Sequence, residues 1–233
     1  MNTQQRLSRA LQHTISEQET LLLVNHLRFV LEQNKNINLT RIDDEERGMV
    51  LHIEDSLTAL QEIEEAPEGR LVDLGSGGGF PGIPLAIMTG RKTTLVEATK
   101  KKGRVLEEFV QKNGLGNQVD VATMRIEELA RTTAGRYTVA TARALSSLAA
   151  LMELSAPLLA VDGFLVAYKG NLSDSELNEA KRVEAILGMA LHSRREMVLS
   201  DGETRREIVV FKKNGPARLL LPRREGQAQH HPL

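Results

Sequence analysis

The chain has 233 residues, 41% of them apolar, which suffices for one sizeable α/β domain with an appended helical piece but not for two equal domains. It contains no cysteine, which excludes a disulfide framework, a thiolate zinc site and a thiol nucleophile. The net charge of −1 hides an asymmetry, because residues 1–69 hold thirteen acidic and six basic side chains. The remainder is correspondingly basic, which fits either one basic face or two ordinary solvated surfaces.

Metal and membrane sites are not expected. His13, His26, His52 and His192 lack the spacing of metal ligands, and the other two histidines belong to the C-terminal tail. The N-terminus lacks the basic and apolar pattern of a signal peptide, and no apolar run approaches the roughly 20 residues of a membrane helix. We therefore expect a cytoplasmic protein.

Residues 1–69 are predicted to form a helical N-terminal extension. Apolar side chains at helical spacing indicate two helices in residues 1–33, with a break near Ser16. Asp43 or Asp44 could cap a further helix. His52, Asp55 and Ser56 on that helix are too crowded for a nucleophilic triad, and they are interpreted as a local hydrogen-bond cluster.

From residue 70 strand and helix signals alternate, which is typical of βαβ units and a parallel sheet. The expected strands are 70–74, 93–97, 119–122, 137–142, 163–168, 196–199 and 207–212, and the expected helices are 81–89, 101–113, 147–159 and 173–187. The turn at Asp201 and Gly202 is too short for a parallel crossover. We therefore predict a Rossmann-like seven-stranded, mostly parallel sheet that ends in an antiparallel hairpin. The tail, residues 214–233, is mostly polar, and its end is expected to be poorly ordered.

The stretch LVDLGSGGGFPGIPLA, residues 71–86, reads as a strand, a tight glycine loop and a helix N-terminus. Glycines let the loop backbone approach a ligand closely. The loop contains a literal GxGxxG, but its register fits a pyrophosphate poorly. Asp73 at the strand end, followed by Gly75 and Gly77, better suits a nucleotide-like ligand that carries an ammonium group, because a carboxylate repels a pyrophosphate.

Further polar residues follow the later strands. Glu97 ends the second strand, where a carboxylate can accept both hydroxyls of a ribose; alternatively it pairs with Lys100 or Lys101. Ile126 and Glu127 follow the third strand in an expected loop beside the adenine site. Arg143 ends an apolar strand and needs a partner, which could be a ligand carboxylate, a phosphate or a neighbouring Glu. Lys169, after the fifth strand, is a candidate substrate contact.

The motifs DLGSGGGFPGIPLA, NLTRI, HIEDSL, VEATKKKGRVL, RIEEL, ARALSSL and TRREIVVFKK together resemble the RsmG (GidB) family. The similarity runs from about residue 36 to residue 213, and the tail beyond about Gly215 matches nothing in it. Members are bacterial methyltransferases that use S-adenosylmethionine to form 7-methylguanosine at one guanosine of small-subunit (16S) ribosomal RNA.

The resemblance implies that residues 70–213 form an S-adenosylmethionine-binding methyltransferase domain. It places Gly75, Phe80, Ile126, Glu127 and Arg143 in the cofactor pocket, and Glu97 is carried over with them. The expected partner is ribosomal RNA or the small ribosomal subunit, and the expected state is a monomer. No residue is assigned a catalytic role, because the N7 lone pair of guanine accepts a methyl group without losing a proton.

Two basic runs could contact RNA phosphates. Residues 91–104 hold six basic side chains against one acidic, and residues 194–224 hold nine against four. Such runs are equally common on exposed helices and hairpins. Two rival functions stay open: a nicotinamide-dependent oxidoreductase that uses the same loop, and a non-catalytic RNA-binding assembly factor.

Overall fold

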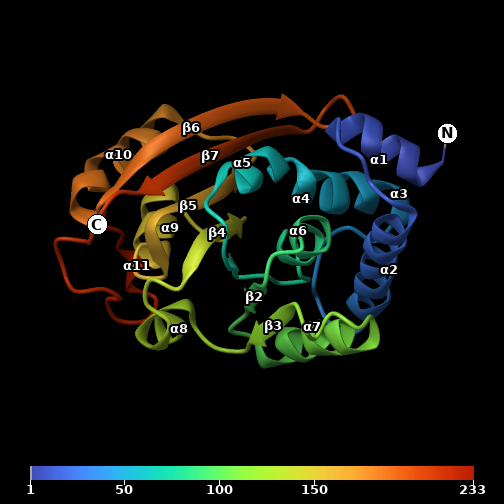
Figure 1. Cartoon of the computed structure of the whole chain (residues 1–233), viewed down its shortest axis with the longest axis horizontal. Helices are drawn as coiled ribbons and strands as arrows, with labels where there is room; N and C mark the ends of the chain where they lie inside the picture. Colours follow the sequence, from blue (N-terminus) through green and yellow to red (C-terminus); the bar gives the residue numbers. More distant parts are fainter. Residues whose placement is uncertain (1) are drawn as a thin grey trace.

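The computed structural model describes residues 2–233 as a seven-stranded sheet with helices on both faces (Figure 1). The strands are β1 (Leu71–Leu74), β2 (Thr93–Val96), β3 (Val119–Ala122), β4 (Tyr137–Arg143), β5 (Leu159–Lys169), β6 (Met189–Val198) and β7 (Arg205–Lys213). Their order is β3-β2-β1-β4-β5-β7-β6. Strands β1 to β5 run parallel, and β7 pairs antiparallel with β5 and β6. The predicted fold class is confirmed.

The helices divide between the two faces of the sheet. They are α1 (Thr3–Leu11), α2 (Glu17–Asn34), α3 (Glu45–Gly48), the π-helix η1 (Met49–Glu54), α4 (Asp55–Leu57), α5 (Leu60–Glu65), α6 (Gly82–Thr89), α7 (Lys100–Lys112), α8 (Ile126–Thr132), α9 (Leu148–Ser155), α10 (Asp174–Leu187) and α11 (Gln227–His230). One core joins the sheet to α8, α9 and α10, and two others join it to α6, α7 and the N-terminal helices. Since both faces are covered, β1 is buried throughout and reads as a short apolar run.

The N-terminal helices begin as predicted and then depart from regular geometry. The break between α1 and α2 lies at Ser16, which caps α2, and Asp44 caps α3 by accepting from the Arg47 amide at 2.8 Å. The expected single helix is then interrupted by η1, a wide turn that buries His52 and Ile53. Such π-helical turns are frequent at functional sites.

Several boundaries differ from those expected. β6 begins at Met189 rather than at 196, because polar side chains such as Arg194 and Arg195 hide the strand signal while the backbone pairs with β7. β5 begins at Leu159, before a register shift near Asp162. α8 replaces the loop expected at residues 126 and 127, since seven residues are too few for a clear helical period.

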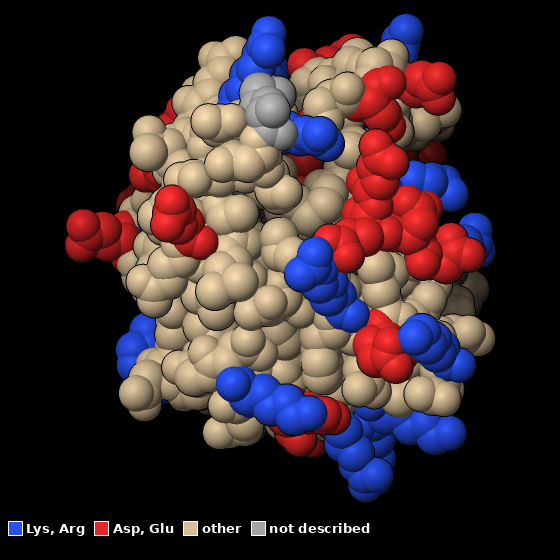
Figure 2. Space-filling model, turned by 90° about the vertical axis from the view of Figure 1, so that its right-hand side faces the viewer, with Lys and Arg blue, Asp and Glu red and all other residues tan. Residues whose placement is uncertain are grey.

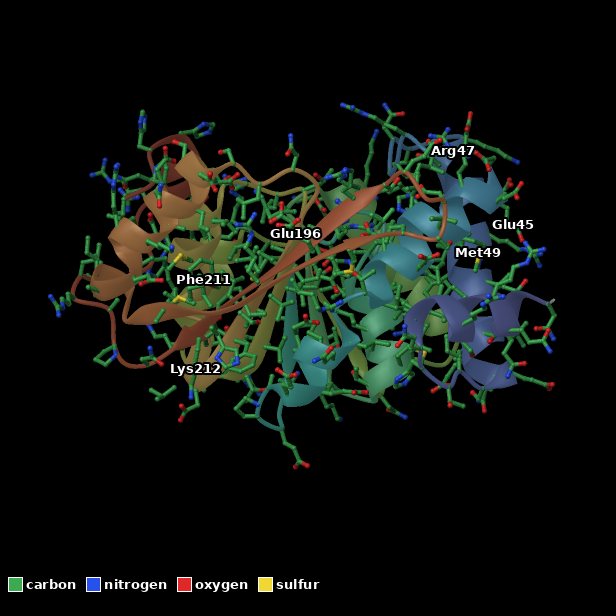
Figure 3. The ribbon with its side chains drawn as sticks, turned by 90° about the horizontal axis from the view of Figure 1, so that it is seen from above. Glu45, Arg47, Met49, Glu196, Phe211 and Lys212 are labelled. Carbon is green, nitrogen blue, oxygen red and sulfur yellow. The ribbon has the colours of Figure 1, made fainter. Side chains whose placement is uncertain are left out.

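The hairpin links the two ends of the molecule. Seen from above, it runs from Phe211 and Lys212 towards the end that carries Glu45, Arg47 and Met49 (Figure 3). There Ser200 donates from its amide and its hydroxyl to the buried carboxylate of Glu54. The hairpin is therefore anchored on the N-terminal helices.

The tail makes more contacts than its polar composition predicts. Leu219 and Leu221 pack against the core that joins the sheet to α8, α9 and α10, and Ala228 is buried within that core. None of the helices in residues 2–233 combines the length and apolarity needed to cross a bilayer.

Candidate active site

The carboxyl ends of β1, β2, β3, β4 and β5 meet at one edge of the sheet, where ligands bind in open α/β folds. The residues singled out from the sequence lie at these ends or in the segments that follow them: Asp73, Gly75, Gly77, Phe80, Glu97, Ile126, Glu127, Arg143 and Lys169. The fold thus brings the residues predicted from the sequence to one edge of the sheet.

The glycine loop is held by the end of β2. Gly75 and Gly77 have φ values of 70° and 56°, which L side chains rarely adopt. The Gly77 amide donates to Glu97 Oε2 at 3.0 Å, and the Thr99 amide donates to Glu97 Oε1 at 2.7 Å. Glu97 therefore orders the loop, and no ion pair within residues 2–233 joins it to Lys100 or Lys101. A carboxylate has about four acceptor positions, so Glu97 can still accept from a ribose.

Asp73 lies beneath the loop and is fully buried. Its Oδ1 accepts from the Thr141 hydroxyl at 2.7 Å, and its Oδ2 accepts from the Gly82 amide at 3.3 Å. Burial raises the pKa of this carboxyl, against the lowering effect of its hydrogen bonds. Asp73 joins β1 to β4 and to the start of α6, so both oxygens that were predicted to meet a ligand ammonium have protein partners.

Phe80 is clamped between two histidines of the N-terminal helices. Its ring stacks on His52 with centroids 4.5 Å apart and an angle of 7°, and it lies 4.3 Å from His26. The Arg143 guanidinium lies 5.6 Å from the same ring. The Phe80 side chain therefore packs into the protein interior, and this contact joins the glycine loop to the N-terminal helices.

Both histidines are neutral. Burial is the main cause that lowers the pKa of His26 to about 3 and that of His52 to about 3, and Arg143 contributes to each. His26 Nε2 donates to the Gly78 carbonyl at 2.9 Å, which leaves its Nδ1 without a partner among residues 2–233. His52 Nδ1 accepts from Arg143 at 3.3 Å, so its Nε2 carries the proton and donates to the Thr40 hydroxyl at 2.7 Å.

The partner of Arg143 is Asp55, a carboxylate of the N-terminal helices. Arg143 Nη1 lies 2.7 Å from Asp55 Oδ2, and the Arg206 guanidinium on β7 binds both Asp55 oxygens at 2.5 and 2.9 Å. The Asp55 side chain is 1% exposed. One buried carboxylate thus joins α4, β4 and β7. From the sequence the expected partner of Arg143 was a ligand carboxylate, a phosphate or a neighbouring Glu, whereas Asp55, which belongs to the HIEDSL motif, was not expected.

The other two strand-end positions also have protein partners. The Lys169 ammonium pairs with Glu176 at 2.7 Å and donates to the Ser146 carbonyl at 3.2 Å. Ile126 is buried, and Glu127 Oε1 accepts from the amide of Gly226 in the tail at 2.7 Å. No sequence signal connected the tail with this edge.

The two basic runs, residues 91–104 and 194–224, differ in how many of their basic side chains are paired with acidic ones and are therefore unavailable to a polyanion such as RNA. In the second run five of the nine basic side chains, Arg194, Arg195, Arg206, Lys212 and Arg223, pair with acidic side chains. Arg205, Arg218 and Arg224 of this run are exposed and make no ion pair within residues 2–233. In the first run, Lys100, Lys101, Lys102 and Arg104 on α7 make no ion pair within residues 2–233 and are mostly exposed. Figure 2 shows acidic side chains gathered over the N-terminal helices and basic ones along the lower edge, at the level of α7.

A large cavity lies elsewhere on the molecule, away from the carboxyl ends of the parallel strands. A cavity of about 1250 Å³ lies between α1, α3, η1 and the hairpin turn, and none of its lining residues belongs to the strand-end set. Within residues 2–233 no three His, Asp or Glu side chains come together in an arrangement that could hold a metal ion.

The shared carboxylate leads to a stability prediction. Asp55→Ala leaves two part-buried guanidinium groups without their counter-charge and should cost about 3–5 kcal/mol of unfolding free energy. Arg143→Ala leaves Asp55 bound to Arg206 and should cost about 1.5–3 kcal/mol. Urea unfolding measures both values, and equal losses would contradict a carboxylate shared by two arginines.

The buried histidine leads to a pH prediction. The folded-state pKa of His26 lies below the unfolded value, so the unfolded chain takes up a proton first and stability is lost as pH falls from about 6.5 towards 3. His26 should contribute about 1.4 kcal/mol per pH unit within that window. His26→Gln should therefore show a shallower loss of stability between pH 6 and pH 4 in urea titrations. An unchanged slope would show that His26 titrates normally in the folded state.

Known structures resemble the fold at low sequence identity. Geranyl diphosphate C-methyltransferase from Streptomyces coelicolor has a TM-score of 0.53 and 15% identity, covering 68% of this chain and 78% of its own. The tRNA methyltransferase TrmK of B. subtilis has a TM-score of 0.54 and 19% identity, covering 67% and 65%. At these identities the likeness establishes the fold, which is that of class I methyltransferases.

Sequence relatives give the family. The relative from Lactobacillus helveticus is 33% identical and covers 89% of this chain and 88% of its own, and that from Pelotomaculum thermopropionicum is 34% identical and covers 94% and 92%. Both are ribosomal RNA small subunit methyltransferase G. The model of the GidB family, rRNA small subunit methyltransferase G, matches residues 19–209. The chain therefore belongs to the rRNA small subunit methyltransferase G family.

Proposed function

We propose that the protein transfers a methyl group from S-adenosylmethionine to N7 of one guanosine in small-subunit (16S) ribosomal RNA. The family match over residues 19–209 carries this proposal, because it spans the glycine loop and every strand-end residue described above. We further propose that the protein acts as a monomer in the cytoplasm. Its substrate is ribosomal RNA, free or within the small subunit.

The loop and the strand ends fit an adenosine-containing ligand. A Cβ placed on Gly77 would have only the Gly75 carbonyl near it, at 4.0 Å, so the loop backbone is open at this point. Gly75, Gly77 and Glu97 would hold the ligand from β1 and β2, and Ile126 and Glu127 would hold it from β3. S-adenosylmethionine supplies a methyl group activated by a sulfonium sulfur.

The reaction needs orientation more than proton transfer. Methyl transfer would form the bond from N7 to the methyl carbon as the bond from that carbon to sulfur breaks, with S-adenosylhomocysteine as the leaving group. No proton leaves N7, so a general base is unnecessary. The histidines nearest the loop agree with this, because both are buried, neutral and bound to the protein. The protein's contribution is to align nitrogen, carbon and sulfur, for which effective molarities of about 10⁵–10⁸ M are attainable.

The basic residues of α7 are suited to hold RNA phosphates. They follow the end of β2, so they stand at the ligand edge of the sheet. Cations in the first turn of a helix oppose its dipole by roughly 0.3–1 kcal/mol each, and no acidic side chain occupies this turn. A phosphate would offset that repulsion, whereas S-adenosylmethionine is itself cationic at sulfur. We assign Lys100, Lys101 and Lys102 to RNA phosphates.

The glycine register and the family argue against a nicotinamide oxidoreductase. The first glycine of the literal GxGxxG comes late, at Gly77, and Pro81 falls within the match. A non-catalytic RNA-binding assembly factor is an alternative outcome of the following experiment.

The test is methyl transfer from labelled S-adenosylmethionine to protein-free rRNA and to small subunits from cells that lack the enzyme. Nucleoside analysis should find the label in 7-methylguanosine. Label in any other nucleoside would contradict the proposed reaction, and no label with retained RNA binding would favour the assembly factor. Calorimetry should show binding of S-adenosylhomocysteine and none of NADH.

Neutralising the α7 lysines should weaken RNA binding without affecting the cofactor. A Lys100→Gln, Lys101→Gln, Lys102→Gln variant should lower RNA affinity and reduce the slope of log K against log salt by roughly 2, at about 0.7 per lost phosphate contact. Lys112→Gln, at the other end of α7 and paired with Glu108, is the control. A wild-type salt slope in the triple variant would remove these lysines from the RNA interface.

A further inference from the structure

The C-terminal tail is fixed to the sheet face opposite the N-terminal helices by a buried ion pair. The Arg223 guanidinium binds both carboxylate oxygens of Glu153 on α9, at 2.6 and 2.5 Å. The Glu153 side chain is 2% exposed and that of Arg223 is 19% exposed. A bidentate pair of this kind fixes direction as well as position, so the tail is anchored where it passes α9.

Beyond the anchor the tail closes into a loop. Arg223 Nη2 also donates to the His231 carbonyl at 2.8 Å, so residues 223–231 begin and end at the same guanidinium. Ala228, within the loop, is buried in the core. We call residues 223–231 the C-terminal strap.

The strap reaches the ligand edge at Glu127. The Gly226 amide donates to Glu127 Oε1 at 2.7 Å, and Glu127 is 5% exposed. Gly226 has a φ of 74°, and a Cβ there would lie 3.3 Å from Arg125 Nη2. Glu127 Oε2 makes no hydrogen bond within residues 2–233. The strap therefore orients the carboxylate and leaves one oxygen able to accept from a ligand.

We infer that the C-terminal strap is part of the cofactor site, with Gly226 as a positioning residue that fixes Glu127 against the adenosine half of S-adenosylmethionine. This inference rests on the proposed function. The strap lies outside the family-matched residues 19–209, and it meets this edge in the Gly226–Glu127 hydrogen bond and the Glu225–Arg131 ion pair. Of these contacts only the hydrogen bond involves a residue assigned to the ligand, so we expect the strap to affect ligand affinity through Glu127.

The test is a double-mutant cycle on S-adenosylhomocysteine binding, measured by calorimetry. Gly226→Val forces a β-branched residue into a left-handed backbone conformation and displaces the amide from Glu127. Its dissociation constant should rise about tenfold, the value of one hydrogen bond to a charged group. Gly226→Ala should raise the dissociation constant by a smaller factor. This milder variant keeps the test possible if the Val variant does not fold. In a Glu127→Ala background, neither substitution should raise the constant further.

The matched control is Gly202→Val in the hairpin turn. Gly202 has a φ of 75°, and a Cβ there would meet nothing within 4 Å, so the substitution brings the same backbone strain without the contact. Its affinity should equal that of the wild type. Unchanged affinity for S-adenosylhomocysteine in the Gly226 variants would overturn the inference, and so would an equal loss of affinity in the wild-type and Glu127→Ala backgrounds. In either case, binding by the wild-type protein would still support the proposed function. No binding by the wild type would contradict the proposed function itself and the inference with it.

Discussion

The structure depends on one buried carboxylate with two cationic partners. Asp55 is almost inaccessible to water and binds Arg143 at the end of β4 and Arg206 on β7. Two part-buried guanidinium groups this close together are costly unless they share such a counter-charge. The requirement brings the N-terminal helices, a central parallel strand and the antiparallel hairpin together at the ligand edge. Arg143 in turn donates to His52 and lies over Phe80, so the order of the glycine loop is linked to the same carboxylate.

The glycine loop is consequently supported from two directions. Glu97 holds it from β2 through the Gly77 amide, and His26 holds it from α2 through the Gly78 carbonyl. The histidines perform this task in their neutral forms, which suits a reaction that needs no general base. On the opposite side of the edge, the strap sets the direction of Glu127. The proposed site is thus built from the N-terminal helices, the sheet and the tail, and the proposed reaction depends on alignment of the reacting atoms.

The sequence predicted the features that depend on local pattern and missed those that depend on distant partners. Alternating strand and helix signals indicated the parallel sheet, and the short turn at Asp201 and Gly202 indicated the hairpin. The length of β6 was underestimated because many of its side chains are polar, whereas the strand is held by backbone hydrogen bonds to β7. Arg143 was recognised as needing a partner, yet 88 residues separate it from Asp55, and no pattern in the chain specifies that pairing. The same holds for Gly226 and Glu127, which are 99 residues apart.

The N-terminal helices and the glycine loop act as one unit through Phe80, Arg143 and Asp55. Amide hydrogen exchange with and without S-adenosylhomocysteine tests it most directly, because exchange reports local opening segment by segment. Because the two segments are linked, the ligand should slow exchange in the loop, residues 75–81, and by a similar factor in residues 51–57. Slowing confined to the loop, with unchanged exchange in residues 51–57, would contradict it.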